Sequence, residues 1–191
     1  MTKVFFGGSR GLSKLNADLI ARTDKIIENE YRILVGDANG ADKVMQHYLS
    51  DNNYEHVHVY CMEDTCRNNI GGWKTIHICT DRKTKDFNFF STKDLRMSED
   101  ADYGFMLWDG KSKGTLNNIL NLCERNKKAL VYFTPQKSFF TIANFGDISD
   151  LLENCDHDAL QLFEKGINLI TRLNQQQLGF DGHDSGKNIP I

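Results

Sequence analysis

Short apolar runs alternate with longer amphipathic stretches along most of this chain. The apolar runs lie at 3–6, 32–36, 56–61, 103–108 and 129–134. The stretches 12–30, 40–50 and 115–128 repeat apolar residues at helical spacing, and Ser13 could cap the first of them. Strands that alternate with helices predict an α/β fold, here an open, mainly parallel sheet with helices on both faces.

The middle and the end of the chain are harder to interpret. Residues 73–80 are either a further strand or part of an insertion, 81–90 resemble a mobile polar loop, and 91–101 have helical spacing. Beyond Pro135, two helices are predicted at 147–155 and 158–173, and the apolar stripe of the second packs on the core or forms an oligomer contact. We therefore expect a nucleotide-binding domain over 1–135, a helical C-terminal extension packed on it over 136–178, and a flexible tail over 179–191.

Composition narrows the class of protein. The 191 residues are 40% hydrophobic and 26% charged, as in an ordinary globular protein, and the net charge of -3 argues against a surface that coats nucleic acid. No apolar stretch approaches the roughly 20 residues of a membrane span, and the chain enters its first strand without a leader. We expect a cytoplasmic protein without a membrane partner.

The five cysteines point away from a disulfide framework. Their number is odd, so we expect reduced thiols. Cys61 and Cys66 lack the second cysteine pair that would make a zinc site convincing, so no metal site is predicted.

Three glycine-containing polar loops, 7–11, 36–42 and 108–115, each follow a predicted strand. In a parallel sheet they emerge at the carboxyl edge, where open α/β sheets bind ligands. The alternative is that they serve only as turns. The candidate ligand-binding residues on these loops are Gly8, Ser9, Arg10, Gly36, Asp37, Gly40, Asp42, Trp108, Asp109, Gly110, Ser112, Gly114 and Thr115.

Each loop has its own chemistry. Ser9 and Arg10 suit a phosphate group, and the amides and hydroxyls of 110–115 could cradle an anion. Asp37 and Asp42 could hold ribose hydroxyls or the amides of their own loop. Trp108 could stack on a base, or it could be a core tryptophan. None of the loops matches the phosphate-binding P-loop or the GxGxxG dinucleotide fingerprint.

The segments "FFGGSRG", "ILVGDANGAD" and "ADYGFMLWDGKSKGT" together resemble the SLOG superfamily, and most of all its YspA-related branch. Relatives include the LOG phosphoribohydrolases and DprA-type proteins. The resemblance covers about residues 3–134 and implies a Rossmann-like sheet that binds a nucleotide or a nucleotide-derived ligand, such as ADP-ribose or an NAD-related molecule. It also implies that Ser9 and Arg10 lie at the phosphate–sugar end of the pocket.

The chain departs from the hydrolases of this superfamily at two positions. Lys93 stands where the resemblance implies an arginine, and Asn118 stands where it implies a glutamate. An amide cannot act as a base, so we expect little hydrolysis by the LOG mechanism. Asp37, Asp109 and Lys93 are the catalytic candidates if the protein is an enzyme.

Small-molecule nucleotide binding, as a sensor or carrier, is therefore the first hypothesis. The alternative is an N-glycosidic hydrolase or transferase acting on a nucleoside phosphate or an NAD-derived nucleotide. A DprA-like nucleic-acid module is the least favoured, no cofactor is expected, and a homo-oligomer is conceivable.

Overall fold

A computed structural model describes residues 1–177, which form a seven-stranded sheet in the order β4-β3-β2-β1-β5-β6-β7. The first six strands in chain order run parallel, and β7 pairs antiparallel with β6. The strands are β1 (Lys3–Gly8), β2 (Arg32–Gly36), β3 (Val57–Met62), β4 (Lys74–Ile78), β5 (Tyr103–Trp108), β6 (Ala129–Phe133) and β7 (Ser138–Ile142). The predicted α/β class with a mainly parallel, Rossmann-like sheet is confirmed.

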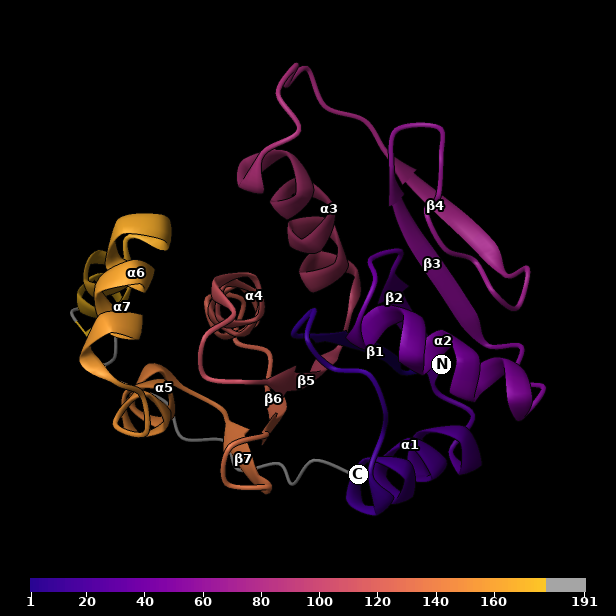
Figure 1. Ribbon diagram of the computed structural model, residues 1–191, viewed down its shortest axis with the longest axis horizontal. Helices are drawn as coiled ribbons and strands as arrows, with labels where there is room; N and C mark the ends of the chain where they lie inside the picture. The colour runs from indigo at the N-terminus through magenta and orange to yellow at the C-terminus, as the bar shows by residue number, and fades with distance from the viewer. Residues whose placement is uncertain (178–191) are drawn as a thin grey trace.

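Helices cover both faces of the sheet (Figure 1). Helices α1 and α2 lie on one face, and α3 and α4 lie on the other. The helices are α1 (Ala17–Glu28), α2 (Ala41–Asp51), α3 (Phe87–Asp100), α4 (Lys113–Cys123), α5 (Phe145–Leu152), α6 (His157–Ile167) and α7 (Leu169–Gln177).

The strands are apolar on both sides, because a parallel sheet with two helical layers is buried on both faces. In β1, Val4 and Phe6 belong to the core under α1 and α2, whereas Phe5 belongs to the core under α3 and α4. In β3, Val59 and Tyr60 divide in the same way. The sheet therefore separates two hydrophobic layers, and its carboxyl edge is left for polar loops.

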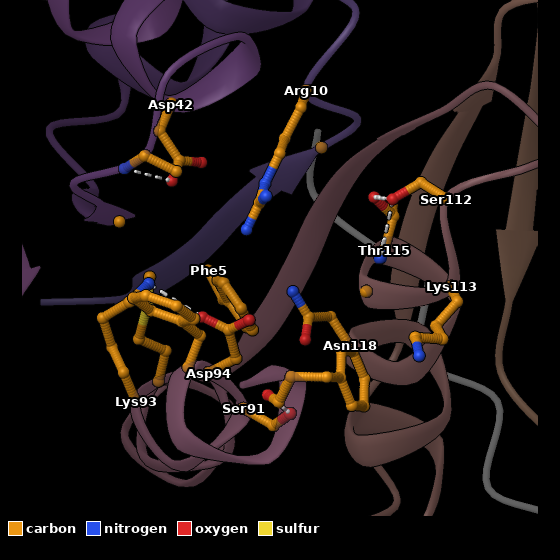
Figure 2. A pocket seen from close by; sticks show the side chains of 18 of the residues that line it. Phe5, Arg10, Asp42, Ser91, Lys93, Asp94, Ser112, Lys113, Thr115 and Asn118 are labelled. Carbon is orange, nitrogen blue, oxygen red and sulfur yellow. Dashed lines mark hydrogen bonds and ion pairs between the residues drawn. The ribbon is translucent and has the colours of Figure 1, made fainter. Parts of the chain in front are cut away.

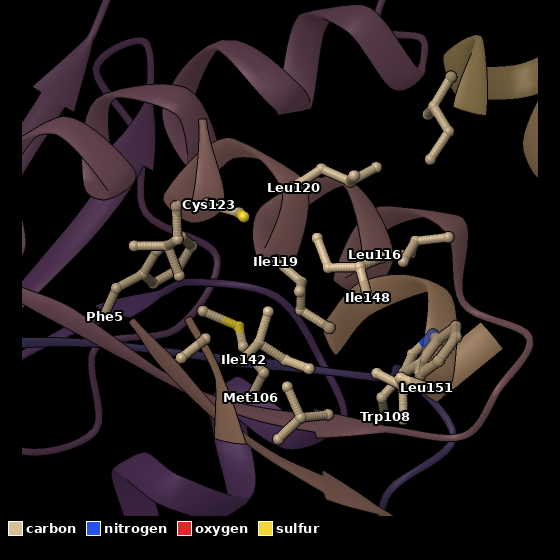
Figure 3. Close-up of a cluster of buried hydrophobic side chains, with 14 of the residues drawn as sticks. Phe5, Met106, Trp108, Leu116, Ile119, Leu120, Cys123, Ile142, Ile148 and Leu151 are labelled. Carbon is tan, nitrogen blue, oxygen red and sulfur yellow. The ribbon is translucent and has the colours of Figure 1, made fainter. Parts of the chain in front are cut away.

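The core on the α4 face extends into the C-terminal region. Figure 3 shows Leu116 and Ile119 of α4 on the side of Ile142 of β7 and Ile148 of α5, and Leu120 belongs to the same buried cluster. Arg172 ties α7 to this layer through its Nη1 and Nη2 atoms, which donate to Oδ1 of Asn117 at 2.7 Å and Oδ1 of Asn121 at 2.9 Å. The sheet also includes β7, which lies in the segment 136–178 that was expected to be a helical extension.

Several local expectations were wrong at their boundaries. Asn16, not Ser13, caps α1, since its side chain accepts from the Leu19 amide at 3.0 Å. Part of the expected polar loop 81–90 is the first turn of α3, which Asp86 caps. The single helix expected over 158–173 is two helices, because Asn168 adopts the left-handed conformation between them. The expectation for residues 179–191 lies outside the described residues.

The cysteine prediction was wrong for one pair. Cys61 and Cys66 form a disulfide, with Cα atoms 5.1 Å apart, whereas Cys79, Cys123 and Cys155 are free. An odd cysteine count could not reveal that β3 and the loop after it bring these two side chains together. Within residues 1–177, no helix is long and apolar enough to cross a membrane.

Candidate functional site

A cavity of about 590 Å³ lies at the carboxyl edge of the sheet, between the loops after β1, β2 and β5 and the helix α3. Strand order reverses here, because β1 and β5 are neighbours whose following helices pack on opposite faces. Figure 2 shows side chains from several elements pointing into it. The polar and charged residues that line it are Arg10, Asp42, Arg67, Lys85, Asp86, Ser91, Lys93, Asp94, Asp109, Lys111, Ser112, Lys113, Thr115 and Asn118.

Ser9 joins the first and third loops. Its amide donates to the Leu107 carbonyl at 2.9 Å, and its Oγ accepts from the Asp109 amide at 3.1 Å. The side chain is 2% exposed and does not line the cavity. Ser9 therefore fixes one loop against the other, and its hydroxyl is already used within the protein.

The glycines of the second loop allow close packing. Gly40 has φ +83°, a conformation that favours glycine, and a Cβ there would overlap the backbone of Arg10. A Cβ on Gly36 would come within 2.7 Å of Lys93 Nζ and would also overlap the Asp42 carboxylate. Gly40 thus lets the second loop pack against the first, and Gly36 leaves room for the buried side chains of Asp42 and Lys93.

The third loop is shaped by its own side chains. Asp109 Oδ1 accepts from the amides of Lys111 at 3.0 Å and Ser112 at 2.7 Å. Ser112 caps α4 and accepts from the Thr115 hydroxyl at 3.0 Å. These bonds turn the start of α4 toward the cavity, where the positive end of the helix dipole favours an anion.

Trp108 is a core residue. Its side chain is 0% exposed, lies 5.7 Å from Phe133 and 5.9 Å from Phe163 between ring centroids, and donates from Nε1 to the Ser112 carbonyl at 3.0 Å. It does not line the cavity. The suggestion that it stacks on a base is corrected: Trp108 is fully buried, and its indole N–H holds the third loop through the Ser112 carbonyl.

Asp37 is bound by an arginine. Arg67 Nη2 donates to Asp37 Oδ1 at 2.6 Å, and Arg67 Nε donates to Oδ2 at 3.1 Å. Burial acts to raise the pKa of Asp37, but the bonds from Arg67 and the charge of Lys93 hold that pKa below its ordinary value. The carboxylate is therefore occupied, and it is the Arg67 side chain that reaches the cavity.

Asp42, Lys93 and Asp94 form a second charge cluster beside it. Lys93 Nζ donates to Asp94 Oδ1 at 2.8 Å, and the lysine is 3% exposed. Burial raises the pKa of Asp42 to about 6, although Lys93 counteracts the rise. Burial lowers the pKa of Lys93, but Asp94 and Asp42 outweigh it and raise that pKa. Lys93 therefore stays charged and neutralises two carboxyl groups.

The basic side chains of the first and third loops have fewer hydrogen-bond and ion-pair partners. Arg10 is exposed and lines the cavity, and within residues 1–177 its guanidinium has no hydrogen-bond or ion-pair partner. Lys111 is also exposed, and Lys113 Nζ lies 4.3 Å from the centroid of the Phe87 ring. On the side of Asp37, the Arg67 guanidinium lies 4.9 Å from the centroid of the Phe90 ring. The cavity thus combines basic groups with two aromatic rings.

The structure brings most of the predicted residues to this cavity and leaves others outside it. Those that line it are Gly8, Arg10, Gly36, Asp42, Lys93, Asp109, Ser112, Gly114 and Thr115. Those that do not are Ser9, Asp37, Gly40, Trp108 and Gly110. Over the described residues, no group of three or more acidic, histidine or cysteine side chains could hold a metal ion.

Sequence reasoning missed the contributions of Arg67, Asp94 and the first turn of α3. Arg67 lies in a loop that follows no recognised motif, and Phe87 and Phe90 lay in a segment expected to be a polar loop. The spacing of Phe87, Phe90 and Asp94, three and four residues apart, was the available signal, because such residues share one helix face.

No protein-family model and no curated protein matches the chain. Among solved structures, DNA processing protein A from Helicobacter pylori matches with a TM-score of 0.52 and 15% identity, over 94% of this chain and 82% of that chain. That protein binds single-stranded DNA. At this identity the likeness shows a shared Rossmann-like fold, and it agrees with the resemblance to DprA-type proteins at that level.

Two expectations are corrected by this neighbour. The sequence favoured a small-molecule nucleotide ligand, with a nucleotide hydrolase or transferase as the alternative, and it disfavoured a nucleic-acid partner. DNA processing protein A, a solved protein that shares the fold, binds single-stranded DNA. Net charge sums over the whole chain and does not describe a single cavity, where six of the 23 Lys and Arg residues and four aspartates lie.

Proposed function

We propose that the protein binds single-stranded nucleic acid, with DNA as the favoured partner, at the cavity on the carboxyl edge of its sheet. The observation that carries this proposal is that Arg10, an exposed residue whose guanidinium has no partner in the described chain, lines this cavity. Lys111 and Lys113 extend the same positive surface along the start of α4. Phosphate groups are the natural partners of such a surface.

The aromatic lining favours a single strand over a duplex. Proteins that bind single strands combine a basic groove with aromatic side chains on which unpaired bases stack. Phe87 and Phe90 supply rings at the first turn of α3, and both are partly exposed at the cavity. Duplex bases are stacked on one another and cannot enter a cavity of about 590 Å³.

We also infer that the chain is a member of the SLOG superfamily, in its YspA-related branch. The three loop motifs and the Rossmann-like fold shared with DNA processing protein A support this assignment. The acidic net charge of -3 implies modest affinity that is restricted to the basic cavity, rather than the broad coating of nucleic acid by a basic domain.

A pair of charge-matched variants tests the proposal. Arg10→Ala removes an unpaired cation of the cavity, and Lys25→Ala removes one positive charge in the last turn of α1, away from the cavity. For a fluorescent 20-nucleotide dT strand, we expect Arg10→Ala to weaken binding by roughly 1.5–3 kcal/mol, the usual size of a hydrogen bond to a charged group. Lys25→Ala should bind like the wild type.

Fluorescence anisotropy at fixed salt measures both affinities. A duplex of the same length serves as the competitor and should displace the single strand poorly. Absence of binding by the wild type, or equal loss in both variants, would contradict the proposal.

A further inference from the structure

Four basic side chains lie together at the amino edge of the sheet, opposite the cavity. They stand near the starts of four neighbouring strands: Lys3 on β1, Arg32 on β2, His58 on β3 and Lys74 on β4. Lys3 is paired in register with Arg32, and His58 is paired with Lys74. We call these four residues the basic row.

The basic row lies on one face of the sheet. Side chains two residues apart on a strand point to the same face. The residues two positions beyond each member of the row all pack in the core under α3 and α4: Phe5, Leu34, Tyr60 and Ile76. Asp100, the last residue of α3, accepts from the Tyr60 hydroxyl at 2.7 Å, so the row lies beside the end of that helix.

The side chains of the basic row are not bonded to the rest of the protein. Within residues 1–177, none of the four has a hydrogen-bond or ion-pair partner. Lys74 is exposed, whereas Lys3, Arg32 and His58 are half-buried. Burial lowers the pKa of His58, and the charges of Arg32, Lys74 and Lys3 lower that pKa further, although Asp100 counteracts them. The members of the row are therefore close enough to repel one another.

The neighbouring carboxylates are bonded elsewhere. Besides the Tyr60 hydroxyl, Asp100 Oδ2 accepts from Arg96 Nε at 3.0 Å. Asp102 Oδ2 accepts from the backbone amide of Lys3 at 2.7 Å and not from its ammonium group. Like charges directly opposite each other on adjacent strands destabilise a sheet. A bound anion would offset this repulsion.

The shape of the row indicates the kind of anion that it suits. Neighbouring strands lie about 4.8 Å apart, so four strands spread the row over roughly 14 Å. One small anion cannot contact all of its members, whereas a chain of phosphate groups can contact several in succession. The row lies roughly 20 Å from the cavity, the length of the 14-residue helix α3, whose first turn lines the cavity and whose last residue lies beside the row.

We propose that the basic row is a second phosphate-binding surface, which holds a further segment of the strand that enters the cavity; this inference rests on the proposed binding of single-stranded nucleic acid. The proposed function alone confines binding to the cavity, and the row extends it to the opposite edge of the sheet. A strand of 30 nucleotides is about 100 Å long even at the roughly 3.4 Å per nucleotide of a stacked strand, so it can reach both. Contacts to phosphate carry no sequence information, so the row should not select a base.

The double variant Arg32→Gln/Lys74→Gln tests this inference. For a fluorescent 30-nucleotide dT strand at 100 mM salt, we expect its affinity to fall roughly 4- to 25-fold, the product of two phosphate contacts of about two- to fivefold each. The plot of log affinity against log salt should become shallower by about 1.4, or about 0.7 for each contact to a single strand. Lys74→Gln alone changes an exposed side chain, should give half of the change in slope, and replaces the double variant if Arg32→Gln impairs folding.

Lys25→Gln/Lys137→Gln is the matched control. It removes two exposed positive charges, on α1 and in the turn between β6 and β7, that belong neither to the row nor to the cavity. Its affinity and salt slope should equal those of the wild type. Unchanged affinity and slope in Arg32→Gln/Lys74→Gln, or equal losses in the two double variants, overturn the inference and leave the proposed function to the separate test with Arg10→Ala. A loss in Arg32→Gln/Lys74→Gln with none in Arg10→Ala supports the row and overturns the cavity as a binding site. Absence of binding by the wild type overturns both.

Discussion

The two sides of the cavity differ in how their polar and charged side chains are bonded. On one side, Asp42, Arg67, Lys93 and Asp94 line the cavity, and Arg67 is bound to Asp37, which does not line it; we call these five residues the paired wall. On the other side lie Arg10, Lys111, Ser112, Lys113 and Asn118, the open wall. Among the described residues, the Arg10 guanidinium of the open wall has no hydrogen-bond or ion-pair partner. The Asn118 Oδ1 atom is buried and also has none.

Burial explains the difference. Lys93 is 3% exposed, and a charge so far from water must be neutralised within the protein. Arg10 is exposed, so water can hydrate its guanidinium when no anion is bound. The comparison teaches that a charged residue at a ligand-binding edge is not necessarily a ligand-binding residue: the paired wall supports the fold, and the open wall is free to bind.

The largest expected effect concerns the paired wall. Lys93→Met removes the cation between Asp42 and Asp94 and leaves two carboxyl groups without it. We expect the free energy of unfolding to fall by about 3–5 kcal/mol, the usual cost of breaking a buried ion pair from one side. Urea unfolding at pH 7 measures this. The exposed substitution Lys25→Met should change the value by less than about 0.5 kcal/mol; a loss no greater than that in Lys93→Met would show that the paired wall carries little stability.

The pH dependence of stability tests the same wall through Asp42. Its pKa is about 6 in the folded protein, above the ordinary 3.8, so the folded state holds the proton more tightly than the unfolded state. This carboxyl group therefore makes the protein less stable as pH rises from about 4 to 6. Asp42→Asn removes that penalty, so the free energy of unfolding of the variant relative to the wild type should rise by up to about 3 kcal/mol over this interval.

Unfolding titrations of both proteins at pH 4 and pH 7, at constant ionic strength, give this difference. Asp37 titrates in the opposite sense, because its pKa is lowered, but it is present in both proteins and cancels. A difference between the proteins that does not change with pH would mean that Asp42 ionises normally.

The smallest expected effect concerns a single cation of the open wall. Lys111→Ala should reduce the affinity for a dT strand only about two- to fivefold at 100 mM salt, since one exposed phosphate contact contributes roughly 0.5–1 kcal/mol. The plot of log affinity against log salt should become shallower by about 0.7, the value for one contact to a single strand. A slope equal to that of the wild type would place Lys111 outside the binding surface.

Much of the fold was predictable from the sequence because the parallel strands are continuous apolar runs. The strands at Lys3–Gly8, Arg32–Gly36 and Tyr103–Trp108 were recognisable in this way, and so was the shared edge of the loops that follow them. What failed was local: β7 is a partly exposed hairpin strand after Pro135, and Asn168 divides two helices by adopting a left-handed conformation that no apolar pattern reveals.

The site was predictable in its position but not in its division into two walls. In the sequence, three polar residues each lie beside a glycine: Ser9, Arg10 and Asp37. Only the folded chain shows that Ser9 bonds to the third loop and that Asp37 is bound by Arg67, which lies 30 residues away. Partners so distant in sequence leave no local pattern.

Photo-cross-linking most directly tests whether single-stranded DNA binds at the cavity, because it reports where the strand lies. A 12-nucleotide dT strand with 4-thiothymidine at its centre is bound to the wild-type protein, irradiated, and mapped by mass spectrometry of the digested complex. The account predicts cross-links in peptides that contain residues 7–11, 87–94 and 109–118, around the cavity. Cross-links confined to other surfaces, such as the exposed side of α6, would contradict it.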